Sequence, residues 1–225
     1  MKLKVSYIDN YIESNNESVA VVEIENRKYF YRLVKDLYSI ALGDISDDIS
    51  FIDNENKEIN ASNKIKLFID FFNIELNSKK YLNDLTKYIL ENINEKNRED
   101  IINIHNRLTK VISIELNKID LPLKISIDSS IDNIIKSMKI SITEKDSMLD
   151  NLFLIIDLEK ILRANKLLCF VNLKQYLSKE EIIELYKYSI YNNVRILLID
   201  SQCYGCKLEY ENKLIIDENL GEFML

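Results

Sequence analysis

Glycine and proline are scarce in this chain, and their scarcity excludes one common kind of site. Gly43, Gly205 and Gly221 are the only glycines in 225 residues, and Pro122 is the only proline. A phosphate-binding loop of the G-x-x-x-x-G-K-[ST] type needs closely spaced glycines before a helix, because its backbone N–H groups must approach the phosphate. No such spacing occurs here, so the sequence argues against an ordinary P-loop nucleotide site.

Cysteine, histidine and long apolar runs are equally rare. Three cysteines are too few for a disulfide framework, which favours a reducing compartment. No unbroken apolar run approaches the roughly 20 residues of a membrane-spanning helix, and Met1 leads into strand-like sequence rather than an apolar signal segment. His105 is the single histidine, and no serine or cysteine near it has the context of a catalytic triad. We therefore expect a cytoplasmic protein without a histidine-based active site.

The charge balance is acidic. The hydrophobic content of 47% and charged content of 30% are those of a globular protein, with a formal net charge of −7. Such a molecule repels polyanions at long range. Binding of nucleic acid would therefore require lysines and arginines gathered on one surface.

The most regular stretch runs from Leu167 to Asp200 and predicts a β-α-β unit. Two continuous apolar runs flank an amphipathic segment, as expected for parallel strands that are covered on both faces. Ser178 and Glu181 have the spacing of a capping box at the start of the helix. The turn after Asn172 contains no glycine, so we interpret this unit as a scaffold rather than a phosphate cradle.

The rest of the chain divides into two kinds of sequence. Before the middle, strand and helix patterns alternate, and the predicted elements are strands at 2–8 and 18–24, a helix at 27–42 and a hairpin at 49–59. From 61 to about 119 the periodicity is helical, with candidate helices at 64–72, 79–93 and 98–118. After Pro122 the alternation resumes, with strands at 123–127 and 139–142, helices at 129–138 and 147–164, and a terminal hairpin of strands at 207–210 and 213–216.

This order predicts an α/β fold with an insertion. The head is a mostly parallel sheet with helices, built from two sequence-distant halves at 1–60 and 123–225. An inserted α-helical leg occupies 61–122.

Several short segments resemble one known family. They are FVN at Phe170–Asn172, LSKEE at Leu177–Glu181, IKSMKISI at Ile135–Ile142, and the closing apolar hairpin. At these places, and in the order of its elements, the chain is similar to the accessory adaptation protein of type II-A CRISPR systems. The resemblance implies a non-catalytic homotetrameric ring that encloses linear double-stranded DNA, is stabilised by calcium and supports spacer acquisition. It also implies that the heads are related to P-loop ATPases. The partners that it implies are the other CRISPR adaptation proteins and the RNA-guided effector nuclease.

Basic residues of the leg and its edges are the candidates for binding DNA. A symmetric ring repeats each of them around its hole and can make a basic lumen inside an acidic protein. Such binding would go to phosphates, without sequence preference and with steep salt dependence. The candidates are Lys64, Lys66, Lys79, Lys80, Lys87, Arg107, Lys110, Lys118, Lys124, Lys136 and Lys139.

Two acidic groups could supply the oxygen ligands that calcium prefers. Neither group has EF-hand spacing. The first group consists of Asp44, Asp47 and Asp48. The resemblance favours the second group, because the family's calcium ligands lie at the junction of leg and head. That group consists of Glu115, Asp120, Asp128 and Asp132.

Cys203 and Cys206 form a C-x-x-C motif, which can be a redox pair or half a zinc site. The sequence after it is extended rather than helical, unlike a thioredoxin motif, so an ordinary loop with thiols is the simpler interpretation. Two other functions remain open from the sequence. The chain could be a P-loop-related nucleotide hydrolase with a degenerate site, or a protein that assembles the adaptation complex without contacting DNA.

Overall fold

The structure is a computed structural model that describes residues 2–13, 15, 17–52, 57–61, 64–121, 123 and 130–225. The chain forms two compact units, which we call the head (Met1–Ile74 with Lys145–Leu225) and the leg (Glu75–Glu144). The leg therefore begins at Glu75 rather than at residue 61, and ends at Glu144 rather than at residue 122. The first difference arises because Ile65–Phe68, expected within a helix, is a strand that pairs with the head sheet.

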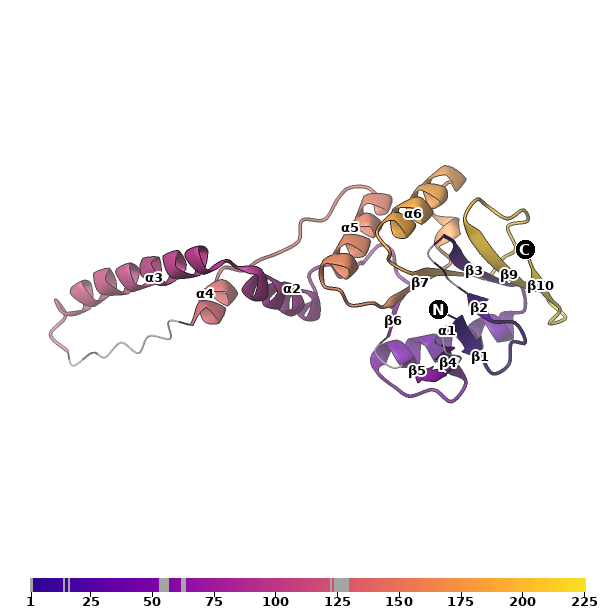
Figure 1. Cartoon of the computed structure of the whole chain (residues 1–225), viewed down its shortest axis with the longest axis horizontal. Coiled ribbons are helices and arrows are strands. Elements are labelled where there is room, and N and C mark those ends of the chain that lie inside the picture. The colour runs from indigo at the N-terminus through magenta and orange to yellow at the C-terminus, as the bar shows by residue number, and fades with distance from the viewer. Residues whose placement is uncertain are drawn as a thin grey trace. The chain divides into compact units, whose positions relative to one another are not determined.

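The head contains a six-stranded sheet in which parallel pairing dominates (Figure 1). Its strand order is β10 (Glu222–Met224), β9 (Glu211–Ile216), β3 (Val19–Ile24), β8 (Ile196–Asp200), β7 (Leu167–Val171) and β6 (Ile65–Phe68). Every neighbouring pair is parallel except β10 with β9. Every residue of β3, β7 and β8 is buried, which explains why their sequences are apolar apart from Glu23 in β3 and Asp200 at the end of β8. The expected α/β fold with a mostly parallel sheet is confirmed.

A smaller antiparallel sheet and one helix cover one face of this large sheet. The small sheet has the order β2 (Ile12–Glu13), β1 (Lys2–Val5), β4 (Ile49–Ile52) and β5 (Glu58–Asn60), so the expected hairpin at 49–59 is confirmed. Helix α1 (Arg27–Leu42) is capped at its start by Asn26, whose side chain accepts from two backbone N–H groups, and at its end by Gly43 with φ 106°. Leu33, Leu37 and Ile40 of α1 pack into one apolar core with β3, β7 and β8.

Two helices lie on the other face of the large sheet. Helix α5 (Met148–Ile161) packs beside α6 (Lys179–Tyr191), and Figure 1 shows both across the sheet from α1. The capping box of α6 is present, with Ser178 and Glu181 each bonded to the other's backbone N–H. The short helix η1 (Leu173–Gln175) joins β7 to α6. The predicted β-α-β unit is therefore confirmed.

The regular secondary structure in the described residues of the leg is helical: α2 (Lys79–Asn92), α3 (Glu95–Leu116) and α4 (Ile131–Ser137). The expected strand at 139–142 is wrong. The backbone of Ile142 instead exchanges two hydrogen bonds, of 2.7 and 3.0 Å, with the side-chain amide of Asn77, which removes its need for a partner strand. The expected strand at 123–127 falls almost wholly outside the described residues.

The end of the chain also differs from expectation in one element. Residues 207–210 form no strand, and the terminal hairpin is made by β9 and β10 instead. The carboxylate of Glu222 on β10 accepts the backbone N–H groups of Asp9 and Asn10, each at 2.8 Å, which joins the end of the chain to its beginning. None of the helices described is long and apolar enough to cross a membrane.

Candidate nucleic-acid interface

The basic residues that we expected to contact DNA divide between the two units. Lys64 and Lys66 belong to the head, at the start of β6. Lys124 lies outside the described residues. The others belong to the leg, where all are exposed: Lys79, Lys80 and Lys87 on α2, Arg107 and Lys110 on α3, Lys118 beyond its end, Lys136 on α4, and Lys139 after it.

Some of these leg lysines pair with a carboxylate one helical turn away. The Nζ of Lys87 lies 3.8 Å from the Oε1 of Glu91, and that of Lys118 lies 2.7 Å from the Oε1 of Glu115. Lys136 pairs in the same way with Asp132. Exposed pairs of this kind contribute about 0–1 kcal/mol, so a phosphate could displace the carboxylate at small cost.

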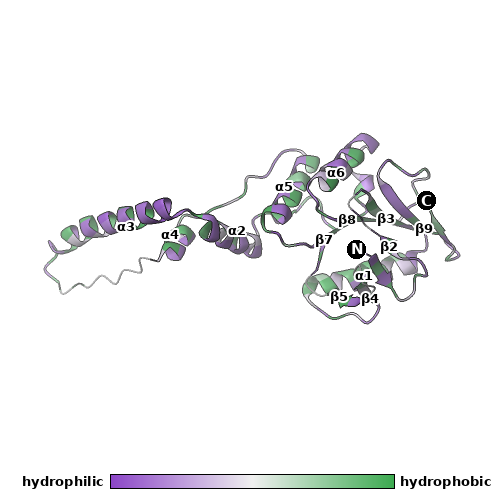
Figure 2. Ribbon diagram, in the orientation of Figure 1, coloured by the Kyte–Doolittle hydropathy of each residue, from purple (hydrophilic) through white to green (hydrophobic). Residues whose placement is uncertain are grey.

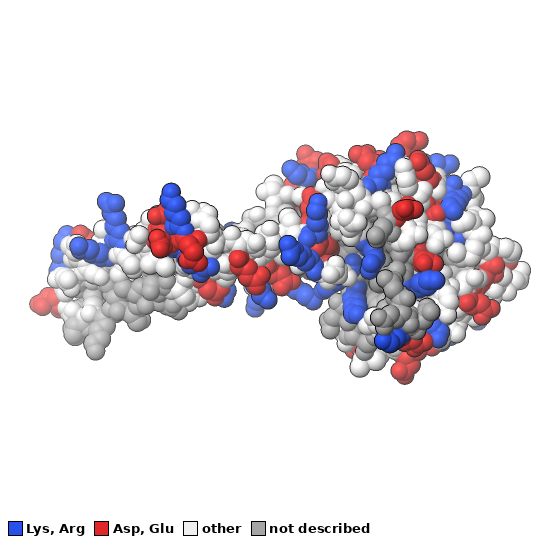
Figure 3. All heavy atoms as spheres, in the orientation of Figure 1, with Lys and Arg blue, Asp and Glu red and all other residues white. Residues whose placement is uncertain are grey.

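Helix α3 carries two of the leg's basic candidates that have no ion-pair partner among the described residues. Arg107 and Lys110 are exposed, and no ion pair within the described residues involves either of them. Figure 3 shows that basic side chains stand out from the leg among acidic ones rather than forming a wholly basic face in that view. A single leg therefore offers scattered positive groups.

The same helix has an apolar stripe that nothing in the described chain buries. None of its 22 residues is buried. Ile104, Leu108 and Val111 follow the helical repeat and are 69%, 57% and 54% exposed. Figure 2 shows hydrophobic and hydrophilic residues along the length of α3. The helical periodicity of this segment was expected from the sequence, but the exposure of its apolar residues was not.

The head lysines have different surroundings. Lys66 is mostly buried and forms an ion pair with Glu159 of α5, whose side chain is 2% exposed. Lys64 is exposed immediately before β6, and its carbonyl accepts the backbone N–H of Leu167. The structure therefore places Lys66 in the framework of the head and leaves Lys64 on its surface.

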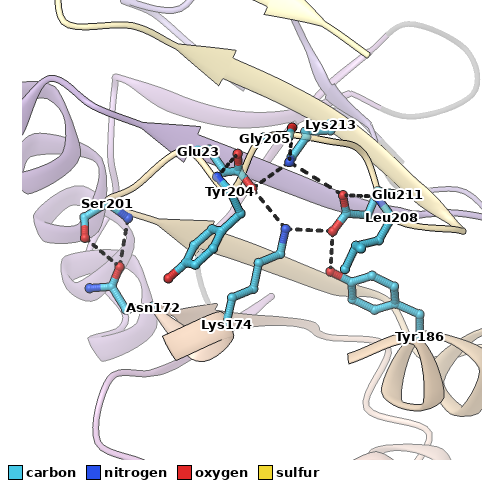
Figure 4. Close-up of polar contacts among 10 residues, drawn as sticks. All are labelled: Glu23, Asn172, Lys174, Tyr186, Ser201, Tyr204, Gly205, Leu208, Glu211 and Lys213. Atoms are coloured by element: carbon cyan, nitrogen blue, oxygen red, sulfur yellow. Dashed lines mark hydrogen bonds and ion pairs between the residues drawn. The ribbon is translucent and has the colours of Figure 1, made fainter. Parts of the chain in front are cut away.

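A buried ion cluster lies within the head, and sequence reasoning did not predict it (Figure 4). The Nζ of Lys174 lies 3.0 Å from the Oε1 of Glu23 and 2.7 Å from that of Glu211. The Nζ of Lys213 lies 2.8 Å from the same Glu23 atom. We call Glu23, Lys174, Glu211 and Lys213 the buried ion cluster. The available signal was charged residues among apolar ones, with Glu23 in the VVEI of β3 and both Glu211 and Lys213 in the ENKLII of β9.

The lysines of the cluster favour the charged form of Glu23. Burial alone would raise the pKa of Glu23, but hydrogen bonds and charge from Lys213 and Lys174 outweigh it, so the pKa of Glu23 is lowered. Asp200, at the end of β8, is also buried, and neither of its carboxylate oxygens has a hydrogen-bond partner among the described residues. Burial raises the pKa of Asp200 to about 7, against the opposing charge of Lys174.

Comparison with known proteins places the chain in a family. A model of the CRISPR-associated protein family Cas_Csn2 matches residues 43–220. The chain belongs to the Csn2 family. Csn2 proteins are accessory proteins of type II-A CRISPR systems that take part in adaptation, so the family resemblance drawn from the sequence is confirmed.

Curated Csn2 relatives cover nearly the whole chain. A CRISPR-associated protein Csn2 from Streptococcus agalactiae is 25% identical over 191 residues, which is 84% of this chain and 83% of the relative. A Csn2 protein from Enterococcus faecalis is 23% identical over 224 residues, with 97% and 96% covered. The crystal structure of Stu0660 of Streptococcus thermophilus matches with a TM-score of 0.64 at 15% identity. The match covers 100% of this chain and 76% of the Stu0660 chain, and it supports the assignment of the fold.

Three of the four acidic residues that resemblance to Csn2 proteins assigns to calcium lie in the described part of the leg. Glu115 pairs with Lys118 and Asp132 with Lys136, Asp120 follows α3, and Asp128 lies outside the described residues. Within the part of the chain that is described, no three histidine, cysteine or acidic side chains form a group that could hold a metal ion. The described carboxylates therefore do not make a calcium site by themselves, and calcium binding stays a prediction.

The other acidic group and the cysteines lie in the head. Asp48 accepts hydrogen bonds from Ser6 and, at 3.0 Å, from Arg32. Cys203 and Cys206 are exposed free thiols in the loop between β8 and β9. The same loop lies over the buried ion cluster, because the Tyr204 N–H donates to Glu23. This contact gives the loop a structural role.

Proposed function

We propose that this member of the Csn2 family is a non-catalytic protein that binds linear double-stranded DNA without sequence preference, as a homotetrameric ring, during spacer acquisition. The observation that carries the proposal is helix α3. It is 22 residues long, has no buried residue, and combines an exposed apolar stripe with exposed basic groups.

The apolar stripe supports self-association. Exposed apolar side chains at helical spacing are unfavourable in water, and each contributes about 1.5–3 kcal/mol when it is fully buried. A second copy that covers Ile104, Leu108 and Val111 would remove this cost. Closed symmetric assemblies are the commonest outcome of such self-association.

The basic groups support binding to phosphate. Arg107 and Lys110 lie beside the stripe on α3 rather than within it, so an assembly through the stripe leaves both accessible. Symmetry would then repeat these charges on every copy. A ring of such legs could attract DNA locally although each chain has a net charge of −7.

The interior of the head favours a non-catalytic role over nucleotide hydrolysis. Ligands of open α/β sheets bind beyond the carboxyl ends of the parallel strands, and in P-loop proteins a glycine-rich turn holds the phosphates there. In this chain, the turn that follows β7, beginning at Asn172, contains no glycine. The ammonium group of Lys174 is engaged by Glu23 and Glu211. An absence of ATP binding in calorimetry would agree with this proposal.

Charge reversal on α3 tests the binding of DNA. We expect the double variant Arg107→Glu/Lys110→Glu to bind a linear duplex roughly tenfold or more weakly than the unchanged chain, with a smaller salt slope. The matched control is Lys28→Glu/Lys35→Glu on α1, which changes the net charge equally at exposed head positions. If both double variants lost the same affinity for DNA, the result would contradict a specific role for α3. Binding would then depend on the net charge of the chain.

A substitution in the stripe tests assembly separately. Leu108→Glu should lower the molar mass measured by light scattering, because it places a charge in the contact between copies. Leu42→Glu is the control, since Leu42 is also an exposed leucine, at the end of α1. A monomeric mass for the unchanged chain would remove the ring from the proposal. A pull-down of the other adaptation proteins by Arg107→Glu/Lys110→Glu separates the two roles of the protein. If this variant loses DNA binding and still captures those proteins, binding DNA is distinct from assembling the adaptation complex.

A further inference from the structure

Helix α1 of the head presents two stripes of side chains on opposite faces. One stripe packs into the apolar core through Leu33, Leu37 and Ile40. Because each residue turns the helix by about 100°, the residues halfway around it from these three point to solvent. Five of these are exposed, and we call them the α1 outer stripe: Lys28, Tyr31, Lys35, Tyr38 and Leu42.

The α1 outer stripe has the spacing of a contact between helices. Its members follow one another at intervals of three, four, three and four residues. This alternation marks the contact positions of a coiled coil, in which one helix lies along another. From Lys28 to Leu42 the stripe extends about 20 Å, because a helix rises about 1.5 Å per residue. The stripe therefore matches about four turns of a second helix.

Much of the apolar area of the stripe lies in water. Tyr31, Tyr38 and Leu42 are 67%, 50% and 68% exposed. Neither tyrosine ring stacks on another ring, and neither hydroxyl has a hydrogen-bond partner, in the part of the chain that is described. Tyrosine is enriched at protein interfaces, because its ring contributes a large contact area and loses few rotamers on binding. The stripe therefore offers apolar contact area to a partner.

The two lysines of the stripe are not used by the fold. Among the described residues, neither Lys28 nor Lys35 forms an ion pair or a side-chain hydrogen bond. Arg32 on the same helix differs, because it pairs with Asp48 at 3.0 Å. Lys28 also lies in the first turn of α1, where the helix macrodipole is positive and a second positive charge is unfavourable. Both cations are therefore available to carboxylates of a partner.

The charge and the shape of the stripe decide which partner fits. Two copies of the stripe would bring lysines together in either direction, with Lys28 and Lys35 each meeting its counterpart in a parallel pair and Lys35 meeting its counterpart in an antiparallel pair. Like charges in contact are unfavourable. A helix surface is convex, whereas proteins hold single-stranded nucleic acid in a positively charged groove. A helix with carboxylates opposite the lysines meets neither objection.

We propose that the α1 outer stripe docks an acidic amphipathic helix of another protein. Glutamate or aspartate side chains of that helix pair with Lys28 and Lys35, while its apolar side chains pack on Tyr31, Tyr38 and Leu42. The stripe shares no residue with α3. Docking at this surface is therefore independent of the ring and of DNA binding.

Two synthetic peptides test the proposal by fluorescence anisotropy with the full chain. The acidic peptide carries glutamate and leucine alternately along one stripe at spacings of three and four, and a lactam bridge on its far face keeps it helical. In the basic peptide, lysine replaces each of these glutamates. We expect the acidic peptide to bind at least about tenfold more tightly than the basic one, with an affinity that falls as salt is added. Equal binding of the two peptides, or binding of neither, would overturn the proposal.

The decisive variant is Lys28→Glu/Lys35→Glu. It should bind the acidic peptide at least about tenfold more weakly and should gain binding of the basic peptide, because the charges are then exchanged. Its melting temperature should equal or exceed that of the unchanged chain, since a carboxylate at position 28 suits the start of a helix. A variant that still prefers the acidic peptide would refute the pairing.

The tyrosines are tested by truncation. Tyr31→Ala/Tyr38→Ala should weaken binding of the acidic peptide about tenfold, because it removes most of the apolar contact. Tyr191→Ala is the control, since Tyr191 is 82% exposed at the end of α6. Equal affinities for these two variants would show that the tyrosines of α1 make no contact with the peptide.

Two further measurements exclude other occupants. A labelled single-stranded oligonucleotide that binds where the acidic peptide does not, and is lost in Lys28→Glu/Lys35→Glu, would make the stripe a nucleic-acid surface and overturn the proposal. A lower molar mass for Lys28→Glu/Lys35→Glu than for the unchanged chain would show that copies of the chain meet here, and would overturn it equally.

This proposal and the proposed function can fail separately. Arg107→Glu/Lys110→Glu should lose binding of a linear duplex and keep binding of the acidic peptide. Lys28→Glu/Lys35→Glu should lose the acidic peptide and keep the duplex. If the unchanged chain binds the duplex but not the peptide, docking at α1 is refuted alone, and the opposite result refutes DNA binding alone.

Discussion

Lys174 and Glu211 form an ion pair inside the head, with the Nζ of Lys174 lying 2.7 Å from the Oε1 of Glu211 and side chains that are 5% and 0% exposed. The pair joins η1 to β9, and the hydroxyl of Tyr186 on α6 donates to the same carboxylate oxygen at 2.9 Å. One carboxylate therefore connects the sheet to two elements that cover it. This interior is held by charge as well as by apolar contact.

Removing Lys213 should strongly destabilise the head. Lys213→Met leaves Glu23 and Glu211 with one cation instead of two in a buried site, and unpairing a buried charge costs about 3–5 kcal/mol. Urea denaturation measures this loss. Lys4→Met, which breaks the exposed pair with Glu58, is the control and should leave the midpoint nearly unchanged. Equal small effects would show that the cluster contributes no more than a surface pair.

Asp200 should make stability fall as the pH rises. Its pKa is raised to about 7 by burial, above the ordinary value of 3.8, so between these values the folded chain holds a proton that the unfolded chain has lost. The stabilisation is complete below pH 4 and is lost as the pH rises through 7. Asp200→Asn should therefore gain stability relative to the unchanged chain at pH 8 more than at pH 5, as measured by urea denaturation. A constant difference would contradict the raised pKa.

Glu23 acts in the opposite direction in the same titration. The pKa of Glu23 is lowered, so its contribution to stability is present above its ordinary pKa and is lost as the pH falls below it. The two groups titrate in separate ranges. Measurements between pH 5 and pH 8 therefore report Asp200 without interference from Glu23.

Asn172 should stabilise the head in two separable ways. It has φ 57°, and its Oδ1 accepts hydrogen bonds from the backbone N–H of Ser201 at 2.8 Å and from the Ser201 hydroxyl at 2.9 Å. Asn172→Gly keeps the backbone conformation accessible and loses only the hydrogen bonds, at about 1–2 kcal/mol. Asn172→Ala should cost about 1 kcal/mol more, because alanine is strained there. Equal unfolding free energies for the two variants would show that backbone strain is not involved.

Calcium should raise the solution mass if the predicted acidic residues bind it. We expect light scattering to give a tetramer with calcium and a smaller species in excess chelator, since calcium would offset the repulsion among carboxylates. Asp120→Asn should weaken this dependence, and Asp84→Asn on α2 is the control. A mass that does not respond to chelator would remove calcium from the account.

Local signals predicted much of the fold, and long-range contacts decided the rest. The β7-α6-β8 unit could be predicted because its cap and its apolar runs are contiguous. Residues 64–72 were expected to be helical, yet Ile65–Phe68 pairs with β7, because partnership with a distant strand overrides a short ambiguous pattern. The buried ion cluster could not be predicted for a related reason. Glu23 and Lys174 meet across 151 residues of sequence, and a lysine is ordinarily assumed to face water.

The candidate site was only partly predictable. Exposed lysines on α2 and α3 follow from their polar positions on amphipathic helices, but the ion pair of Lys66 with Glu159 depends on a strand that was not expected.

A comparison of linear and covalently closed circular duplexes of the same sequence tests the central claim most directly. A ring can thread onto a free end but cannot pass onto a closed circle. We therefore expect binding to the linear form, weakening steeply with salt, and little binding to the circle, with linearisation of the circle restoring it. Equal binding to the linear and circular forms would contradict a ring that encloses DNA.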